Sequence, residues 1–109
     1  MELSEKRCLA CEGGVRILSF EQSQTLLKKL NHWSISDDHK SIIKKFEFKN
    51  YDRTMAFVNA TAWISHHENH HPDLTVSYNS CVVQYTTHAI NGLSENDFIC
   101  AAKVDALSD

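Results

Sequence analysis

The chain contains a single proline, Pro72, and its position sets where the longest predicted helix has to stop. Proline cannot continue an α-helix, and it biases the residue before it, His71, toward an extended conformation. Residues 52–69 carry apolar side chains at helical spacing, Asn50 is a good N-cap, and Asp52 suits the positive end of the helix dipole. The helix therefore ends inside the histidine-rich run before Pro72, and a new element has to begin after it.

Short strands are predicted on both sides of this helix. Residues 33–35 and 42–48 alternate apolar and polar side chains before it, and residues 74–78 and 81–87 do so after it. A short turn separates the second pair, which predicts an antiparallel hairpin. By the same alternation, Tyr78 is expected on the buried face of its strand.

Two further helices complete the chain. Ser19 begins the first, with Gln22 in the capping-box position, and Asn31 ends it. Ser94 begins the last, and the capping-box position three residues on gives Asp97 a structural role. The order α-β-β-α-β-β-α predicts an α+β fold, a four-stranded antiparallel sheet with helices packed on one face.

Length and composition describe one small globular domain. A chain of 109 residues suffices for a single core, so we expect one domain over residues 1–109, with the polar residues 1–17 as an N-terminal arm. A net charge of -3 gives no footprint for nucleic acid, and no apolar run reaches the roughly 18 residues of a membrane span. The N-terminus carries no secretory signal, so a cytoplasmic location is expected.

The four cysteines favour free thiols over a metal or redox motif. Cys8 and Cys11 form a C-x-x-C, whereas Cys81 and Cys100 stand alone in apolar surroundings. A zinc ribbon would need a second C-x-x-C, and a redox pair would be expected after a strand of a βαβ unit. We therefore expect free thiols in a reducing compartment.

Five of the seven histidines lie between residues 66 and 88, at positions 66, 67, 70, 71 and 88. Histidine has the unperturbed pKa nearest neutrality, so such a cluster predicts either proton transfer or metal binding. A solvated, histidine-rich helix end is the structural alternative. Proton transfer on a small heterocycle or carbonyl compound is favoured, because two or three imidazoles could protonate a leaving hydroxyl and remove a neighbouring proton near pH 7.

The run at residues 67–71 also spells H-E-x-x-H, which on a helix would place two histidines on zinc with Glu68 as general base. Three features count against this interpretation. His71 directly precedes Pro72, no third ligand lies on a following helix, and the chain is small for a peptidase. A zinc site is therefore kept as the least favoured alternative.

Taken together, these residues resemble the pterin-4a-carbinolamine dehydratase family. The resemblance covers essentially the whole chain and is strongest over residues 63–105. The matching features are the run His66-x-x-x-His70-His71-Pro72, Tyr78, the segment Thr86-Thr87-His88, the segment 92–97 ending in Asp97, Trp33 and the early C-x-x-C.

The resemblance implies dehydration of 4a-hydroxytetrahydropterin to quinonoid dihydropterin, which recycles the cofactor of aromatic amino-acid hydroxylases. It implies that pterin is the substrate, with no metal and no bound cofactor, and that the protein forms a homodimer or homotetramer. The residues it places at the site are His70, His71 and His88 as catalytic groups, and Asn69, His70, His71, Thr86, Thr87, His88 and Ala89 as substrate-binding groups.

Within this set, we expect His70 and His88 to form the acid–base pair and His71 to orient the substrate. Two positions depart from the family pattern. His66 stands where many members carry glutamate, and Asn69 replaces an aspartate found in some relatives. The family also includes members that act as dimerisation cofactors or transcriptional coactivators, so a protein-interaction role is the alternative function.

Overall fold

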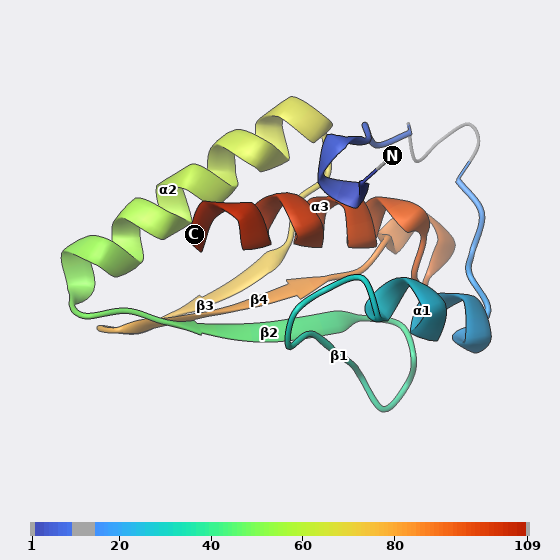
Figure 1. Ribbon diagram of the computed structural model, residues 1–109, viewed down its shortest axis with the longest axis horizontal. Helices are drawn as coiled ribbons and strands as arrows, with labels where there is room; N and C mark the ends of the chain where they lie inside the picture. Colours follow the sequence, from blue (N-terminus) through green and yellow to red (C-terminus); the bar gives the residue numbers. More distant parts are fainter. Residues whose placement is uncertain (1, 10–14, 109) are drawn as a thin grey trace.

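The computed structural model describes residues 2–9 and 15–108 of the chain (Figure 1). Within these residues, three α-helices and four strands form the fold, and short 3-10 helices (η) lie near both ends of the chain and after the last strand. In chain order the elements are η1 Leu3–Glu5, α1 Phe20–Leu27, β1 Ser34–Ile35, β2 Ile42–Glu47, α2 Tyr51–Glu68, β3 Asp73–Val76, β4 Ser80–Tyr85, η2 His88–Ile90, α3 Glu95–Asp105 and η3 Ala106–Ser108.

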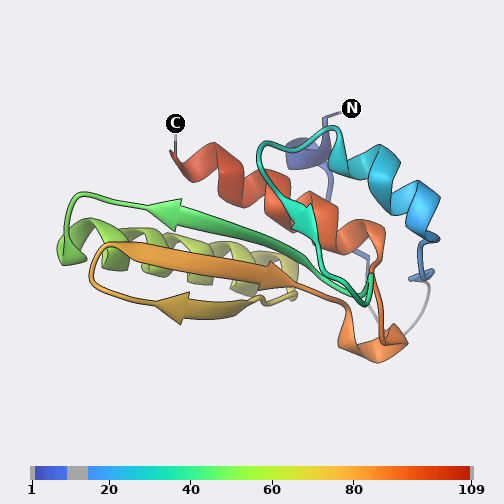
Figure 2. The ribbon, with the colours of Figure 1, turned by 90° about the horizontal axis from the view of Figure 1, so that it is seen from below.

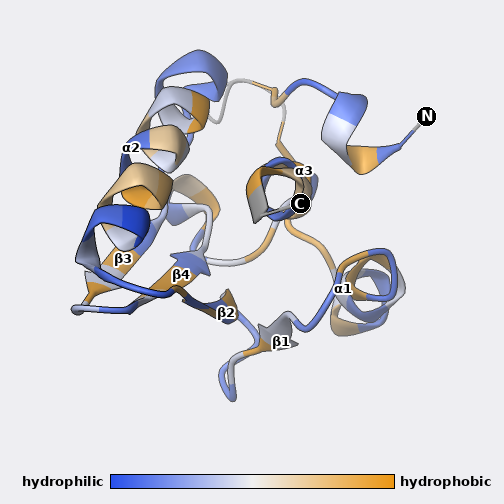
Figure 3. Cartoon of the chain, turned by 60° about the vertical axis from the view of Figure 1, so that its left-hand side comes forward, coloured by the Kyte–Doolittle hydropathy of each residue, from blue (hydrophilic) through white to orange (hydrophobic). Residues whose placement is uncertain are grey.

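The strands form one antiparallel sheet in the order β1-β2-β4-β3. The central pair has Ile42 opposite Tyr85 and Phe46 opposite Cys81, and all four side chains are buried. Helices α2 and α3 cross one face of the sheet, and α1 lies beside β1 (Figures 2 and 3). This arrangement confirms the predicted α+β fold and its element order.

Helix α2 begins and ends where its sequence predicts. The Asn50 side chain accepts a hydrogen bond from the Arg53 backbone N–H at 3.0 Å, which satisfies one of the unpaired amides of the first turn. At the other end Asn69 takes the left-handed conformation, with φ 53°. Asparagine tolerates this region better than most residues, and Pro72 prevents the helix from resuming. The chain therefore turns away from the helix axis between Glu68 and Pro72.

The core lies between the sheet and its two covering helices. Apolar side chains from β2, β4 and α3 supply most of it, and α2 adds Phe57 and Ile64. Lys44 alternates with the buried Ile42 and Phe46 and so shares the inner face of β2, and its Nζ pairs with Asp105 Oδ1 at 2.8 Å. The Trp33 indole N–H donates to the same carboxylate at 3.0 Å, so the buried polar groups at this end have partners.

Two expectations about the hairpin were wrong. Strand β3 stops at Val76, and the Tyr78 side chain is 64% exposed instead of buried. The reason is local: the Ser77 N–H donates to the Ser80 carbonyl, so Tyr78 lies in a turn, where period-2 alternation no longer applies. Strand β4 ends at Tyr85, two residues before the predicted end at residue 87, and His88 begins the η2 turn.

Residues 2–9 of the N-terminal arm pack along α3. Its 3-10 turn buries Leu3 against the core, and Lys103 Nζ donates to the Ser4 carbonyl at 2.8 Å. Helix α1 has the predicted capping box of Ser19 and Gln22 but ends at Leu27, before the expected stop at Asn31. Among the described residues, no helix is long and apolar enough to cross a membrane.

Candidate active site

A fully buried carboxylate, Asp97, organises the end of the molecule where the histidines gather. Its Oδ2 accepts hydrogen bonds from the Ser94 backbone N–H at 2.9 Å and from the Thr87 hydroxyl at 2.8 Å. The Thr87 and Ser94 hydroxyls are themselves 2.8 Å apart. The capping box predicted from Ser94 and Asp97 is therefore present, and the same carboxylate also reaches beyond its helix.

The other oxygen of Asp97 holds His70. The distance from His70 Nε2 to Asp97 Oδ1 is 2.7 Å, and only 6% of His70 is exposed. The imidazole lies parallel to the Tyr85 ring, with 5.8 Å between their centroids. A carboxylate at this position sets which ring nitrogen carries the proton and compensates the charge of a doubly protonated ring.

Asp97 contacts one segment through His70 and a second segment through Thr87, and the next residue of each segment points to the surface. His71 follows His70, and His88 follows Thr87; both are exposed, and their ring centroids are 6.3 Å apart. Asp97 thus ties together the two segments whose following residues face one another. The sequence alone could not show this, because 27 positions separate His70 from Asp97.

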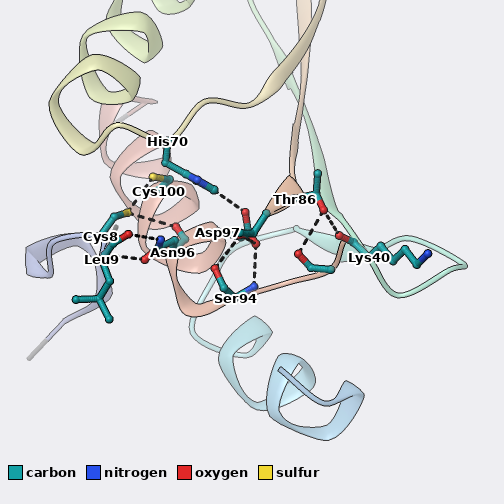
Figure 4. Close-up of polar contacts among 11 residues, drawn as sticks. Cys8, Leu9, Lys40, His70, Thr86, Ser94, Asn96, Asp97 and Cys100 are labelled. Atoms are coloured by element: carbon teal, nitrogen blue, oxygen red, sulfur yellow. Dashed lines mark hydrogen bonds and ion pairs between the residues drawn. The ribbon is translucent and has the colours of Figure 1, made fainter. Parts of the chain in front are cut away.

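The short η2 turn carries His88 and Ala89 at the surface. Backbone hydrogen bonds between Thr87 and Gly92 close the loop, and Asn91 adopts the left-handed conformation within it, with φ 52°. The Thr86 hydroxyl donates to the Lys40 carbonyl (Figure 4). Of the residues expected to bind substrate here, His88 and Ala89 are exposed, Thr86 is half-buried, and Thr87 lies under the surface against Asp97.

The residues of the H-E-x-x-H run make separate contacts. His67 stacks on the exposed Trp63, with ring centroids 4.8 Å apart. Glu68 turns inward, where its carboxylate accepts from the Cys8 backbone N–H at 2.8 Å and pairs with Arg7 Nε at 2.9 Å. Among the residues that the structure describes, no group of three or more histidine, cysteine, aspartate or glutamate side chains could hold a metal ion.

Glu68 is held ionised by these contacts. Burial acts to raise the pKa of its carboxyl, but the Cys8 amide, the Arg7 guanidinium and the Lys103 ammonium outweigh burial and lower the pKa below its usual range. The carboxylate therefore anchors the N-terminal arm two residues before His70, instead of serving as a general base.

Two cavities lie away from the group formed by Asp97, His70, His71 and His88. One, of about 600 Å³, is lined by η1, residues 29–31 after α1, and Asp105, and the other, of about 380 Å³, lies between α1 and β1. Neither contains a buried carboxylate held against an imidazole. The choice of site therefore depends on chemistry: Asp97, His70 and the opposed rings of His71 and His88 form a group of titratable side chains suited to proton transfer.

The sequence indicates the histidines as site residues, but it does not show which residue holds them in position. Asp97 was expected to serve as a helix cap, and its bond to His70 was not foreseen. Tyr85 was expected only in a strand, yet its ring packs on His70, and its hydroxyl is buried without a hydrogen-bond partner among the described residues. Burial raises the pKa of Tyr85, which keeps the phenol neutral.

Comparison with known proteins identifies the family that the chain matches. Residues 16–107 match the family described as pterin 4 alpha carbinolamine dehydratase. The chain is 59% identical over 107 residues to a Nitrosomonas eutropha protein named "Putative pterin-4-alpha-carbinolamine dehydratase", covering 97% of this chain and 93% of that protein.

Two solved structures are similar to this chain. One is described as a transcriptional coactivator/pterin dehydratase from Brucella melitensis, with a TM-score of 0.83 and 28% identity, covering 86% of this chain and 100% of that one. The other is described as a pterin dehydratase-like protein that is a RuBisCO assembly factor in the alpha-carboxysome. It has a TM-score of 0.63 and 25% identity, covering 72% of this chain and 90% of that one.

Proposed function

This chain belongs to the pterin 4 alpha carbinolamine dehydratase family, and we propose that it dehydrates a 4a-hydroxytetrahydropterin to quinonoid dihydropterin and water. The observation that carries the proposal is the arrangement around Asp97. One buried carboxylate holds both His70 and Thr87, and so brings the exposed rings of His71 and His88 to 6.3 Å from each other.

The reaction needs two proton transfers. An acid gives a proton to the 4a-hydroxyl so that it leaves as water, and a base takes a proton from the neighbouring atom so that a double bond can form. One proton is given and one is taken, so exchange with water returns the site to its starting state. No redox change occurs, and the pterin supplies both bonds that break.

We assign these transfers to His70 and His88. Asp97 compensates the positive charge that His70 carries when it donates as an acid, as the aspartate does in a catalytic triad. His88 is exposed and can exchange protons with water between turnovers. His71 faces His88 and orients the pterin between them, and Asn69, Thr86 and Ala89 line the approach as further substrate contacts.

The wider role that we propose comes from the family resemblance and from the sequence. The proposed enzyme acts in the cytoplasm as a homodimer or homotetramer and needs neither metal nor bound cofactor. Its product is the oxidised form of a hydroxylase cofactor, so its function is linked to an aromatic amino-acid hydroxylase. The family match supports the pterin as substrate class, while the hydroxylase link and the assembly remain proposals.

A hydroxylase-coupled assay tests the reaction directly. Dehydration of the 4a-carbinolamine is followed with wild type, His71→Ala and His67→Ala. His67 is a matched control, because it is an exposed histidine of the same run that stacks on Trp63 away from Asp97. We expect acceleration by wild type and His67→Ala, and little by His71→Ala. No acceleration by wild type over the spontaneous reaction would refute the proposal.

A protein-interaction role is the second candidate. It is supported by the descriptions of the two similar structures, one as a coactivator and one as an assembly factor. Two large aromatic side chains, Trp63 and Tyr78, are 65% and 64% exposed, and aromatic residues are enriched at protein interfaces. The same assay separates the candidates, because a chain that only binds partners would leave the spontaneous rate unchanged.

A further inference from the structure

Two thiols meet beside the histidine site, where the N-terminal arm crosses α3. The Sγ atoms of Cys8 and Cys100 are 3.5 Å apart, although the two residues are 92 positions apart in the chain (Figure 4). Cys100 is fully buried, whereas Cys8 is half-buried. The C-x-x-C motif suggested a different neighbour for Cys8, namely Cys11, which lies outside the described residues.

Hydrogen bonds of the arm hold Cys8 at this place independently of its thiol. Its backbone N–H donates to Glu68 Oε1 at 2.8 Å. The next residue, Leu9, is bonded in both directions to the Asn96 side chain: the Leu9 N–H donates to Oδ1 at 3.0 Å, and Nδ2 donates to the Leu9 carbonyl at 2.8 Å. The Cys8 amide is thus fixed against α2, and the Leu9 backbone is fixed against α3.

We propose that Cys8 and Cys100 form a reversible disulfide site that is oxidised by a low-molecular-weight disulfide. A disulfide bond is about 2.05 Å long, so the two sulfurs need to approach by only about 1.5 Å. The bond would join the arm to α3 one turn beyond Asn96 and Asp97.

The exchange takes place in two balanced steps. The Cys8 thiolate attacks the small disulfide, which forms a mixed disulfide and releases one thiolate. The Cys100 sulfur then attacks Cys8 Sγ, which forms the protein disulfide and releases the second small thiolate, and that thiolate takes the Cys100 proton to become a thiol. In total two protein thiols are oxidised and one small disulfide is reduced to two thiols.

Exposure decides the order of these steps. Only Cys8 has surface that an oxidant can reach, because Cys100 is fully buried. The hydrogen bond with Cys8 and burial raise the pKa of the Cys100 thiol, so it stays protonated until the mixed disulfide is next to it. Cys8 is therefore the entry thiol and Cys100 the resolving thiol.

The experiment oxidises the full-length protein in a buffer of oxidised and reduced glutathione. Peptide mapping by mass spectrometry without reduction should recover a peptide containing Cys8 joined to one containing Cys100. Closing so long a loop should raise the midpoint of thermal unfolding on the order of 10 °C, and dithiothreitol should reverse the shift.

Two matched variants make the result decisive. Cys11→Ser should still form the crosslink and show the thermal shift, whereas Cys8→Ser should show neither; circular dichroism verifies that both are folded. A disulfide between Cys8 and Cys11, a glutathione adduct that stays on Cys8, or no oxidation at all would overturn the proposal. None of these readouts uses pterin dehydration, so the test is independent of the proposed activity.

Discussion

His70 and His71 are neighbours in the chain but lie in opposite environments. His70 is nearly buried, its Nε2 lies 2.7 Å from the Asp97 carboxylate, and its ring packs on Tyr85. His71 is exposed and faces His88 across 6.3 Å. The difference shows that one histidine cluster combines a rigid part, which sets positions, with an accessible part, which can meet a substrate.

The two parts should respond differently to mutation. Changes around Asp97 should lower stability and activity together, because a buried polar group that loses its hydrogen-bond partner destabilises the folded state. Changes at the exposed rings should cost activity alone. Variants that break this pattern would show that the buried and exposed parts are not separate in function.

The largest effect is expected for Asp97→Ala. It leaves the His70 imidazole, the Thr87 hydroxyl and the Ser94 amide without their buried acceptor, so we expect a loss of about 3 to 5 kcal/mol in the free energy of unfolding. Urea unfolding measures it. Asp97→Asn keeps the shape and should lose less stability, while its dehydration rate still falls; equal stability of Asp97→Ala and wild type would contradict the role of this carboxylate.

At the exposed edge, His88→Ala should lower kcat by roughly 100- to 10,000-fold, the usual contribution of general acid–base catalysis. Its free energy of unfolding should change by less than about 0.5 kcal/mol, because the side chain is exposed. His70→Ala should lower both quantities. The coupled assay and urea unfolding of the same preparations make the comparison, and pH–rate profiles of the two variants should each lose one limb. If both variants kept the parent's rate, the assigned acid–base pair would be wrong.

A smaller effect is expected where the arm meets α2. Glu68→Gln removes the charge that the Cys8 amide and Arg7 contact, and should cost about 1 to 3 kcal/mol of stability at neutral pH. Arg7→Ala should cost less than about 1 kcal/mol, because its side chain is 64% exposed. Urea unfolding distinguishes the two, and an equal loss from both variants would contradict the structure.

The contribution of Glu68 to the free energy of unfolding should also depend on pH in a defined direction. The pKa of its carboxyl is lower in the folded protein than the ordinary value of 4.5, so the unfolded chain takes up its proton first on acidification. The stabilisation is therefore complete above about pH 5 and is lost as pH falls through the folded pKa. The stability gap between wild type and Glu68→Gln should shrink at about pH 3.

The smallest effect is expected for His67→Ala. His67 is exposed and contacts Trp63, so its loss should change the unfolding free energy by about 0.5 kcal/mol or less. The dehydration rate should stay at the wild-type value in the coupled assay. A large loss of rate would mean that the site extends along the outer face of α2, beyond the histidines held around Asp97.

Local sequence determined most of the fold, because its signals are short-range. Asn50 and Pro72 delimit α2, Ser94 and Asp97 cap α3, and alternation marks the strands that form the sheet. The prediction failed at Tyr78, where a turn replaced the last residues of a strand. A hydrophobic period describes a strand only as long as the strand continues.

The sequence by itself also determined which residue types were available for chemistry, and the resemblance of the histidine run to a known family. It did not show that Asp97 contacts His70 and Thr87, or that Cys100 meets Cys8. These contacts join segments far apart in the chain: Asp97 meets His70 across 27 positions, and Cys100 meets Cys8 across 92. Only packing of α3 against α2 and the arm brings such groups within hydrogen-bond distance, since no local pattern records which distant side chain a buried carboxylate or thiol will meet.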